Sequence, residues 1–238
     1  MLAAAGIDAV VVALNITPAN LSSTVRSLIA ADNVDGFFVT FPHKLQMLAF
    51  ADRLLQASLR TGATNALRRE PDGSWSAYMF DGQGFVNALL RKGLNVGGKH
   101  VRLYGAGGAG MVIAAALADA SAELSRLWTG KVARPPGPQR CATSLPESGK
   151  FNAESNSWRE ADVIVNASPV GMKDSDGLPE PLGNLAAGTI VGDVVIHPGG
   201  SALIAHAKAF SCSWVDGADM HSGQMEVLMH FFHPHITQ

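Results

Sequence analysis

The sequence has few cysteines and no long apolar run. Two cysteines occur among the 238 residues, at positions 141 and 212. Two thiols cannot build a disulfide framework, and their separation does not match a cysteine metal site. We therefore expect a reduced, cytoplasmic setting. No stretch of about 20 uninterrupted apolar residues occurs, so we expect no membrane span. The first residues also lack the charged start and apolar core of a signal peptide.

An excess of charge of one sign is absent as well. The 18 basic and 20 acidic side chains leave a net charge of -2. No basic run that could follow a phosphate backbone is present, so we expect no nucleic-acid partner. The histidines show neither a His-x-x-x-His pair on a helical face nor a neighbouring cysteine cluster. Pro234 interrupts the terminal group of His230, His233 and His235, so we expect no metal site.

Apolar periodicity and turn residues predict an α/β unit in the first part of the chain. Strands are expected at 7–14, 36–41, 63–68 and 74–78, with a turn at 70–73 between the last two. Helices are expected after the turn at 17–20, at about 44–59, and at 83–91, where Gly93 follows the last turn. The segment 92–98 is rich in glycine and is interpreted as an interdomain hinge.

After this hinge, strands and helices alternate in close order. Strands are expected at 100–104, 123–128, 162–166, 189–196 and 214–216, and helices at 108–120, 202–210 and about 219–233. Apolar strands alternating with helices predict a parallel, doubly wound sheet. We therefore expect an α/β fold with two α/β domains, residues 1–93 plus 218–238 and residues 94–217. Ligands in such folds bind outside the carboxyl ends of the strands, in the crevice between domains.

A glycine-rich turn follows the first strand of the second domain. Residues 105–110 read Gly-x-Gly-x-x-Gly between an apolar strand and an alanine-rich helix. Gly105 allows a tight turn, Gly107 leaves the backbone open to a pyrophosphate, and Gly110 lets the helix pack closely. The phosphates would bind N–H groups at the start of the helix. The pattern favours a Rossmann-like NAD(P)-binding domain over a glycine-rich turn that binds no nucleotide.

The residues that follow favour NADP as the cofactor, with NAD as the alternative. An acid that binds the ribose of NAD is expected roughly 20 residues after the glycines. The segment 127–134 has no Asp or Glu there. Lys131 and Arg134 provide positive charge for a 2′-phosphate instead.

Several motifs together resemble those of the shikimate dehydrogenase family, including its quinate/shikimate and shikimate dehydrogenase-like branches. They follow the family's order over nearly the whole chain. Residues 39–44 resemble Val-Thr-x-Pro-x-Lys, residues 62–65 match Gly-Ala-x-Asn, and residues 81–85 match Asp-x-x-Gly-Phe. Residues 105–109 match the nucleotide loop, residues 166–172 are close to Asn-Ala-Thr-Pro-x-Gly-Met, and Asp216, Gly217, Met220 and Gln224 fit the last motif.

The resemblance implies an N-terminal substrate-binding domain and reversible, NADP-linked oxidation of a ring hydroxyl in shikimate or a related hydroxy acid such as quinate. The family's catalytic pair falls on Lys44 and Asp81. A lysine near its neutral form can accept the proton that the hydroxyl loses as hydride leaves, and Asp81 would orient that lysine. Substrate contacts fall on Thr40, Asn65 and Gln224. Cofactor contacts fall on Gly105, Ala106, Gly107, Gly108, Ala109, Ala167, Ser168, Met172 and Gly217.

Each of these residues also has an ordinary structural interpretation. Lys44 could be a surface lysine in the first turn of a helix, and Asn65 could be a turn amide that bonds its own backbone. Gln224 could be an ordinary helix residue. The shared order of the motifs favours the functional interpretation.

The sequence also departs from the family pattern. The family's first strand, with a Ser-x-Ser segment that holds the substrate carboxylate, would precede Met1, so we expect a misplaced start or omitted upstream residues. Apolar residues stand where the family has polar ones, at Phe38, Met79, Phe80 and Ile196. These changes argue against unmodified shikimate specificity. A second hypothesis is therefore a degenerate paralogue that binds the dinucleotide as a sensor without turnover. Monomer and homodimer both remain open.

Overall fold

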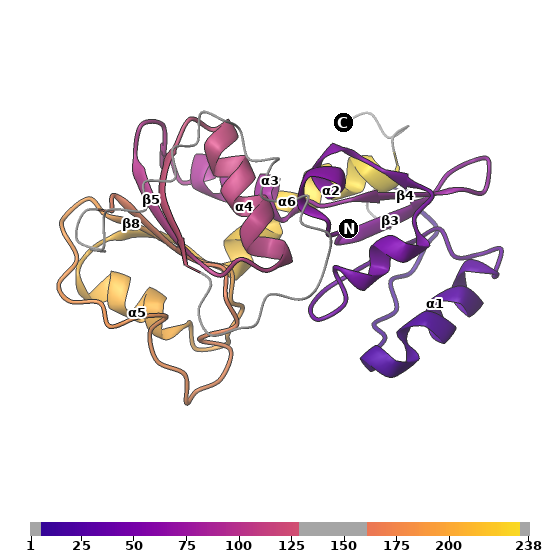
Figure 1. Cartoon of the computed structure of the whole chain (residues 1–238), viewed down its shortest axis with the longest axis horizontal. Helices are drawn as coiled ribbons and strands as arrows, with labels where there is room; N and C mark the ends of the chain where they lie inside the picture. The colour runs from indigo at the N-terminus through magenta and orange to yellow at the C-terminus, as the bar shows by residue number, and fades with distance from the viewer. Residues whose placement is uncertain (1–5, 129–160, 234–238) are drawn as a thin grey trace.

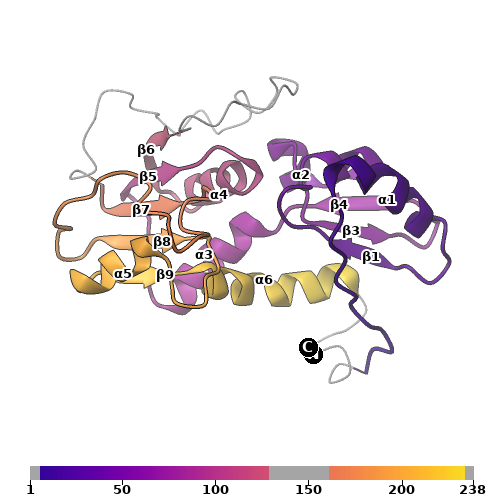
Figure 2. The same ribbon diagram turned by 90° about the horizontal axis from the view of Figure 1, so that it is seen from below.

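The chain folds into two lobes, each built on one sheet. The structure, a computed structural model, describes residues 6–128 and 161–233. Helices α3 (Asp81–Arg91) and α6 (Gly217–Phe232) lie between the lobes (Figure 1). Figure 2 shows α6 extending beneath both sheets. The predicted α/β class with two sheets is confirmed.

The first lobe contains a mixed sheet in the order β1-β3-β4-β2. Its strands are β1 (Gly36–Phe38), β2 (Arg53–Leu54), β3 (Ala66–Arg69) and β4 (Trp75–Tyr78). The pairs β1/β3 and β3/β4 are antiparallel, and β2 runs parallel to β4. The predicted hairpin is therefore confirmed, with bounds shifted by a few residues. Helix α1 (Leu21–Ile29) follows a short 3-10 helix at Pro18–Asn20 and packs on one face of this sheet.

Two of the expected elements in this lobe are wrong. Residues 7–14 form no strand, and Val10, Val11 and Val12 are 86%, 65% and 70% exposed. Apolar content alone does not make a strand, because a strand needs a neighbour for its backbone hydrogen bonds. No strand of the described chain lies beside this segment.

The single helix expected at 44–59 is replaced by three short elements. These are a 3-10 helix at Gln46–Phe50, strand β2 and helix α2 (Gln56–Thr61). The reason lies in a reciprocal pairing of Asp52 with Trp75. The Asp52 N–H donates to the Trp75 carbonyl at 2.8 Å, and the Trp75 N–H donates to Asp52 Oδ2 at 2.8 Å. These bonds hold an extended segment against β4 and interrupt the helix.

The second lobe contains a parallel sheet in the order β6-β5-β7-β8-β9. Its strands are β5 (His100–Tyr104), β6 (Glu123–Trp128), β7 (Val163–Asn166), β8 (Ile190–Asp193) and β9 (Ser213–Val215). Helices α3, α4 (Gly108–Asp119) and the start of α6 pack on one face. Helix α5 (Ala202–Ala209) packs on the other face. The predicted doubly wound parallel sheet is therefore confirmed.

Helices α3 and α6 cross at a very short distance. A β-carbon at Gly223 of α6 would lie 2.2 Å from the Gly84 carbonyl oxygen of α3. Only a residue without a side chain fits at such a crossing. Because Gln224 follows Gly223, the crossing places the Gln224 side chain beside the start of α3. No helix among the described residues is long and apolar enough to cross a membrane.

Candidate active site

Lys44 and Asp81 form an ion pair on the side of the first lobe that meets the second. Lys44 lies in the turn after β1, and Asp81 is the first residue of α3, directly after β4. Lys44 Nζ lies 2.5 Å from Asp81 Oδ2, and the two side chains are 19% and 2% exposed. A carboxylate in the first turn of a helix is favoured by the helix dipole. The sequence-predicted catalytic pair is thus brought together.

Asn65 connects this pair to Gln224. Its Nδ2 donates to Asp81 Oδ1 at 2.8 Å and to Gln224 Oε1 at 3.1 Å. Its Oδ1 accepts the Phe80 backbone N–H at 2.9 Å. A backbone N–H can only donate, so this bond fixes which end of the Asn65 amide is the oxygen. Both Asn65 N–H groups are therefore used within the protein, which the sequence did not predict.

Thr40 occupies the same turn as Lys44 but does not join this hydrogen-bonded group. Its carbonyl accepts the His43 N–H at 3.0 Å, and the residue is exposed. The turn contains a cis peptide bond between Phe41 and Pro42. The Lys44 carbonyl accepts the Thr64 N–H at 2.8 Å, which links this turn to the segment that holds Asn65.

The glycine loop of the second lobe has the backbone that the sequence predicts. Gly105 adopts φ 101°, and a β-carbon there would lie 2.6 Å from the Ala167 carbonyl oxygen. A β-carbon at Gly107 would meet nothing within 4 Å, so this side of the loop is open. Gly107 caps α4 without a side-chain hydrogen bond. The first N–H groups of α4 are thus available for phosphate oxygens, and the loop fits a dinucleotide.

The same loop approaches the Lys44–Asp81 ion pair of the first lobe. A β-carbon at Gly108 would lie 3.2 Å from the Ala63 β-carbon and 3.7 Å from the Lys44 β-carbon. The loop also follows β5, the strand from which the sheet extends in both directions. Ligands in open α/β sheets bind at this switch point, outside the carboxyl ends of the strands. The glycine loop and the Lys44–Asp81 ion pair therefore lie side by side.

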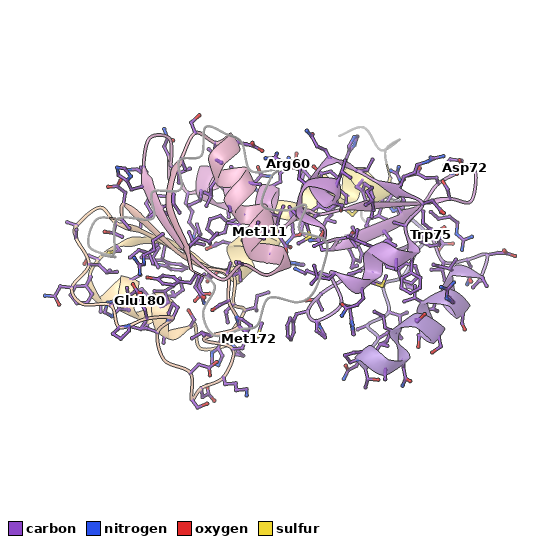
Figure 3. All side chains as sticks on the ribbon, in the orientation of Figure 1. Arg60, Asp72, Trp75, Met111, Met172 and Glu180 are labelled. Carbon is purple, nitrogen blue, oxygen red and sulfur yellow. The ribbon has the colours of Figure 1, made fainter. Side chains whose placement is uncertain are left out.

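The other predicted cofactor residues lie near the glycine loop, and they differ in how exposed they are to solvent. Ala167 and Ser168 follow β7, and the Ala167 N–H donates to the Tyr104 carbonyl at 2.7 Å. Met172 lies on the same loop, at its exposed end (Figure 3). Gly217, which begins α6, is buried, and a β-carbon there would lie 2.6 Å from the Val194 carbonyl oxygen. Gly217 therefore lies under the loop that follows β8.

A buried hydrogen-bond network between these loops was missed by the sequence reasoning. Its centre is Asp193, the last residue of β8, which is fully buried. Burial raises the pKa of Asp193 to about 6, partly offset by hydrogen bonds from Ser201, Val195 and Asn166. The available signal was an acidic residue at the carboxyl end of an apolar strand, where ligand sites form.

The apolar departures from the family pattern fall in different environments. Met79 packs with Ala63 and Val112, and Phe80 packs with the Phe231 ring at 5.3 Å. Both residues are buried in apolar clusters, so their side chains complete cores. Phe38 and Ile196, in contrast, are 51% and 66% exposed. Of these four residues, only Phe38 and Ile196 thus place apolar surface in contact with solvent.

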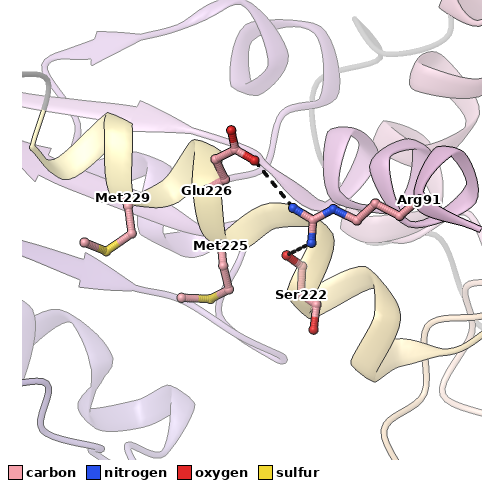
Figure 4. A pocket seen from close by; sticks show the side chains of 5 residues that line it. All are labelled: Arg91, Ser222, Met225, Glu226 and Met229. Carbon is pink, nitrogen blue, oxygen red and sulfur yellow. Dashed lines mark hydrogen bonds and ion pairs between the residues drawn. The ribbon is translucent and has the colours of Figure 1, made fainter. Parts of the chain in front are cut away.

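Some predicted residues fall outside the region just described. Lys131 and Arg134 lie in the segment 129–160 and His235 lies in the segment 234–238, and both segments are outside the described residues. No group of three potential metal-binding side chains occurs within residues 6–128 and 161–233. A shallow pocket on the surface of α6 (Figure 4) contains none of the predicted site residues; it is lined by Arg91, Ser222, Met225, Glu226 and Met229.

Comparisons with known proteins agree with this geometry. Residues 1–67 match the model of the shikimate dehydrogenase substrate binding domain. The chain is 35% identical to a shikimate dehydrogenase (NADP(+)) from Rubrobacter xylanophilus over 212 residues, which cover 86% of this chain and 73% of that protein. A relative of the same name from Acidiphilium cryptum is 32% identical over 219 residues, covering 90% and 76%.

A solved structure extends the similarity to the whole chain. The shikimate 5-dehydrogenase of Thermus thermophilus, in complex with NADP(H) and shikimate, has a TM-score of 0.80 at 26% identity. The match covers 100% of this chain and 87% of that one. Both lobes, and the helices between them, therefore have counterparts in that structure.

Proposed function

Because the chain belongs to the shikimate dehydrogenase family, we propose that it is an NADP-dependent oxidoreductase of the shikimate dehydrogenase type. It transfers hydride reversibly between NADP and a ring hydroxyl of shikimate or a related hydroxy acid such as quinate. The observation that carries this proposal is the contact between the glycine loop and Lys44, with Gly108 beside the lysine that pairs with Asp81. The cytoplasm is the proposed location.

The proposed reaction divides the work between the two lobes. Residues 1–93 and 218–238 form the substrate-binding domain, and residues 94–217 form the cofactor-binding domain. The end of α6 supports this division, because Leu228 and Phe231 pack with Ala66 and Phe80 of the first lobe. The start of α6 packs with the second lobe through Met220. One helix therefore couples the two halves of the site.

Lys44 and Asp81 supply the acid–base chemistry. In the oxidative direction the neutral amine of Lys44 accepts the hydroxyl proton, and in the reductive direction the ammonium returns it. The Asp81 carboxylate holds the lysine nitrogen from one side, and Asn65 holds the carboxylate from the other. An ammonium carries three donors, and Asp81 is its hydrogen-bond partner among the described residues. Donors therefore remain for a substrate hydroxyl.

After Asn65, Gln224 is the second proposed substrate contact. Its Oε1 accepts a hydrogen bond from Asn65, which leaves the Nε2 group to donate to a ring hydroxyl. Thr40, exposed in the turn before Lys44, is the third proposed contact. These side chains thus present both donors and acceptors, as a polyhydroxylated ring requires.

Bound NADP supplies the hydride acceptor, and the glycine loop is suited to hold its pyrophosphate. Gly105, Ala106, Gly107, Gly108 and Ala109 present backbone N–H groups at the start of α4. Ala167, Ser168, Met172 and Gly217 are the proposed contacts on the opposite side of the cofactor. Lys131 is the proposed partner of the 2′-phosphate. The relatives named as NADP(+) enzymes support this cofactor.

The test follows NADPH absorbance with shikimate, quinate and related hydroxy acids in both directions. We expect turnover with NADP, and a Lys44→Ala variant should lose orders of magnitude in kcat while cofactor affinity changes little. Lys208→Ala is the matched control, because Lys208 is an exposed lysine on α5. Cofactor binding without turnover of any hydroxy acid would contradict the proposal and favour a binding-only role.

A further inference from the structure

Asp193 is a buried carboxylate without a cationic partner. Its Oδ1 accepts hydrogen bonds from Asn166 Nδ2 at 2.9 Å and from the Val195 N–H at 3.0 Å. Its Oδ2 accepts from Ser201 Oγ at 2.5 Å. No ion pair to Asp193 is formed within the described part of the chain. A buried carboxylate of this kind is costly, and the three hydrogen bonds from Asn166, Val195 and Ser201 offset part of that cost.

The first partner of Asp193 orders the loop that follows β7. Asn166 Nδ2 donates to the Val170 carbonyl at 2.9 Å as well as to Asp193. Asn166 Oδ1 accepts the Ser168 N–H at 3.1 Å and the Ser168 hydroxyl at 2.6 Å. The Asn166 side chain thus binds both Ser168 and Val170 of the turn that follows β7. Asp193 Oδ1 holds the Nδ2 end of that amide and so ties the turn to the end of β8.

The second partner orders the loop that follows β8. Ser201 caps α5, where its Oγ accepts the Ile204 N–H at 3.2 Å and donates to Asp193 Oδ2. Residues 194–200 are therefore held at their start by Asp193 and at their end by Ser201. The same loop covers Gly217, since a β-carbon there would lie 2.7 Å from Ile196 Cγ1.

A weaker link joins the same two loops at the surface. His197 Nε2 lies 3.0 Å from Asp174 Oδ1, and His197 Nδ1 accepts the Gly199 N–H at 3.2 Å. Asp174 is 96% exposed, so this pair is screened by solvent and contributes little. Asp193 is therefore the buried point at which both loops are fixed.

We propose that Asp193 is a positioning residue for the cofactor, acting through Asn166 and Ser201 to hold loops 167–172 and 194–200 against the nucleotide. This inference rests on the proposed function, because loop 167–172 and Gly217 are cofactor contacts only within that proposal. The glycine loop lies between this network and Lys44: Gly105 approaches Ala167, and Gly108 approaches Lys44. Loss of Asp193 should therefore affect the cofactor and leave the substrate lobe intact.

The test compares Asp193→Ala with Asp193→Asn. Alanine removes every acceptor at this position. Asparagine keeps an oxygen for Asn166 and Val195, and its amide can donate to Ser201 Oγ, which can rotate to accept. We expect the alanine variant to raise the Kd for NADPH by about tenfold or more, since small misplacements of binding groups are costly. The asparagine variant should recover most of the affinity.

NADPH binding is measured by fluorescence titration, which needs no turnover. If the wild type turns over no hydroxy acid but binds NADPH, the proposed function fails and the positioning role is still tested. In an active enzyme, KM for NADPH should rise in Asp193→Ala while KM for shikimate changes less than about twofold. Asp32→Ala, at an exposed aspartate of the first lobe, is the matched control.

Two results would overturn the proposal. One is an unchanged NADPH affinity in a folded Asp193→Ala variant. The other is an equal loss of NADPH and shikimate affinity, which indicates a general structural defect. If the alanine variant does not fold, Ser201→Ala decides the question. That variant removes one hydrogen bond to Asp193 and the cap of α5, and the same selective rise in the Kd for NADPH is expected.

Discussion

The Asn65 side chain donates to Asp81 Oδ1 at 2.8 Å, on the oxygen that Lys44 does not contact. The two bonds hold the carboxylate from opposite sides and leave it 2% exposed. Because Asn65 is itself fixed by the Phe80 N–H, the position of the acid is set by the backbone at the start of α3. Asn65 therefore orients the Lys44–Asp81 ion pair, which is the proposed catalytic pair.

Asn65→Ala should lower kcat more than it changes KM for shikimate. The variant leaves Asp81 Oδ1 and the buried Phe80 N–H without partners, which should also cost about 1–3 kcal/mol of stability. A misoriented Lys44–Asp81 pair should reduce kcat by roughly tenfold to a hundredfold. Steady-state kinetics and thermal unfolding measure both effects. Asn33→Ala, in an exposed turn, is the control. A rise in KM alone would show that Asn65 serves the substrate only.

Gly223→Ala should separate α6 from α3 and move Gln224. The new β-carbon would lie 2.2 Å from the Gly84 carbonyl oxygen, a backbone atom that cannot turn aside. Overpacking of this kind typically costs about 1–3 kcal/mol, and KM for the hydroxy acid should rise with it. Gly177→Ala is the control, because a β-carbon there meets nothing within 4 Å. An unchanged melting temperature and KM would show that the crossing is not tight in solution.

Which residues meet at the candidate site was largely predictable, because ordered motifs identify residues that no periodicity connects. Lys44, Asn65, Asp81 and Gln224 come from separate segments, and the structure brings them together. The glycine loop was also predictable, since a strand, a Gly-x-Gly-x-x-Gly turn and a helix have one favoured arrangement. The parallel sheet followed from the alternation of apolar strands and helices.

What could not be predicted depends on partners distant in sequence. The segment 7–14 is as apolar as a buried strand, but apolar content does not show whether a neighbouring strand is present. Residues 44–59 have a helical pattern, and only the bonds between Asp52 and Trp75 reveal the interruption. The role of Asp193 depends on Asn166 and Ser201, which lie 27 and 8 residues away in the sequence. Such contacts become visible only after folding.

Val25 and Val11 test whether two apolar residues of the first lobe differ in burial in solution. Val25 on α1 is 2% exposed, whereas Val11 is 65% exposed. Val25→Ala removes buried surface and leaves a cavity, so it should reduce the free energy of unfolding by roughly 2 kcal/mol. Val11→Ala should change it by less than about 0.5 kcal/mol. Urea unfolding measures both. Equal losses in the two variants would mean that residues 7–14 are buried in solution.

Asp193 should make the protein less stable as the pH rises from acid toward neutral. Burial raises its pKa from 3.8 to about 6, and nearby Asp216 adds to that rise. Between these values the folded state binds a proton that the unfolded state has lost, so unfolding becomes easier with rising pH. Above about pH 6 the full cost is present, roughly 3 kcal/mol at 1.36 kcal/mol per pKa unit.

Asp193→Asn isolates this contribution, because asparagine does not titrate. Urea unfolding of the wild type and the variant is compared at about pH 5 and about pH 8. Subtracting the variant's free energy of unfolding from that of the wild type at each pH removes the contributions of the other groups that titrate over this range. Relative to the variant, the wild type should lose about 1 kcal/mol between the two conditions, from the same linkage relation. A difference that stays constant or reverses would mean that Asp193 is ionised throughout, and that its three donors outweigh the cost of burial.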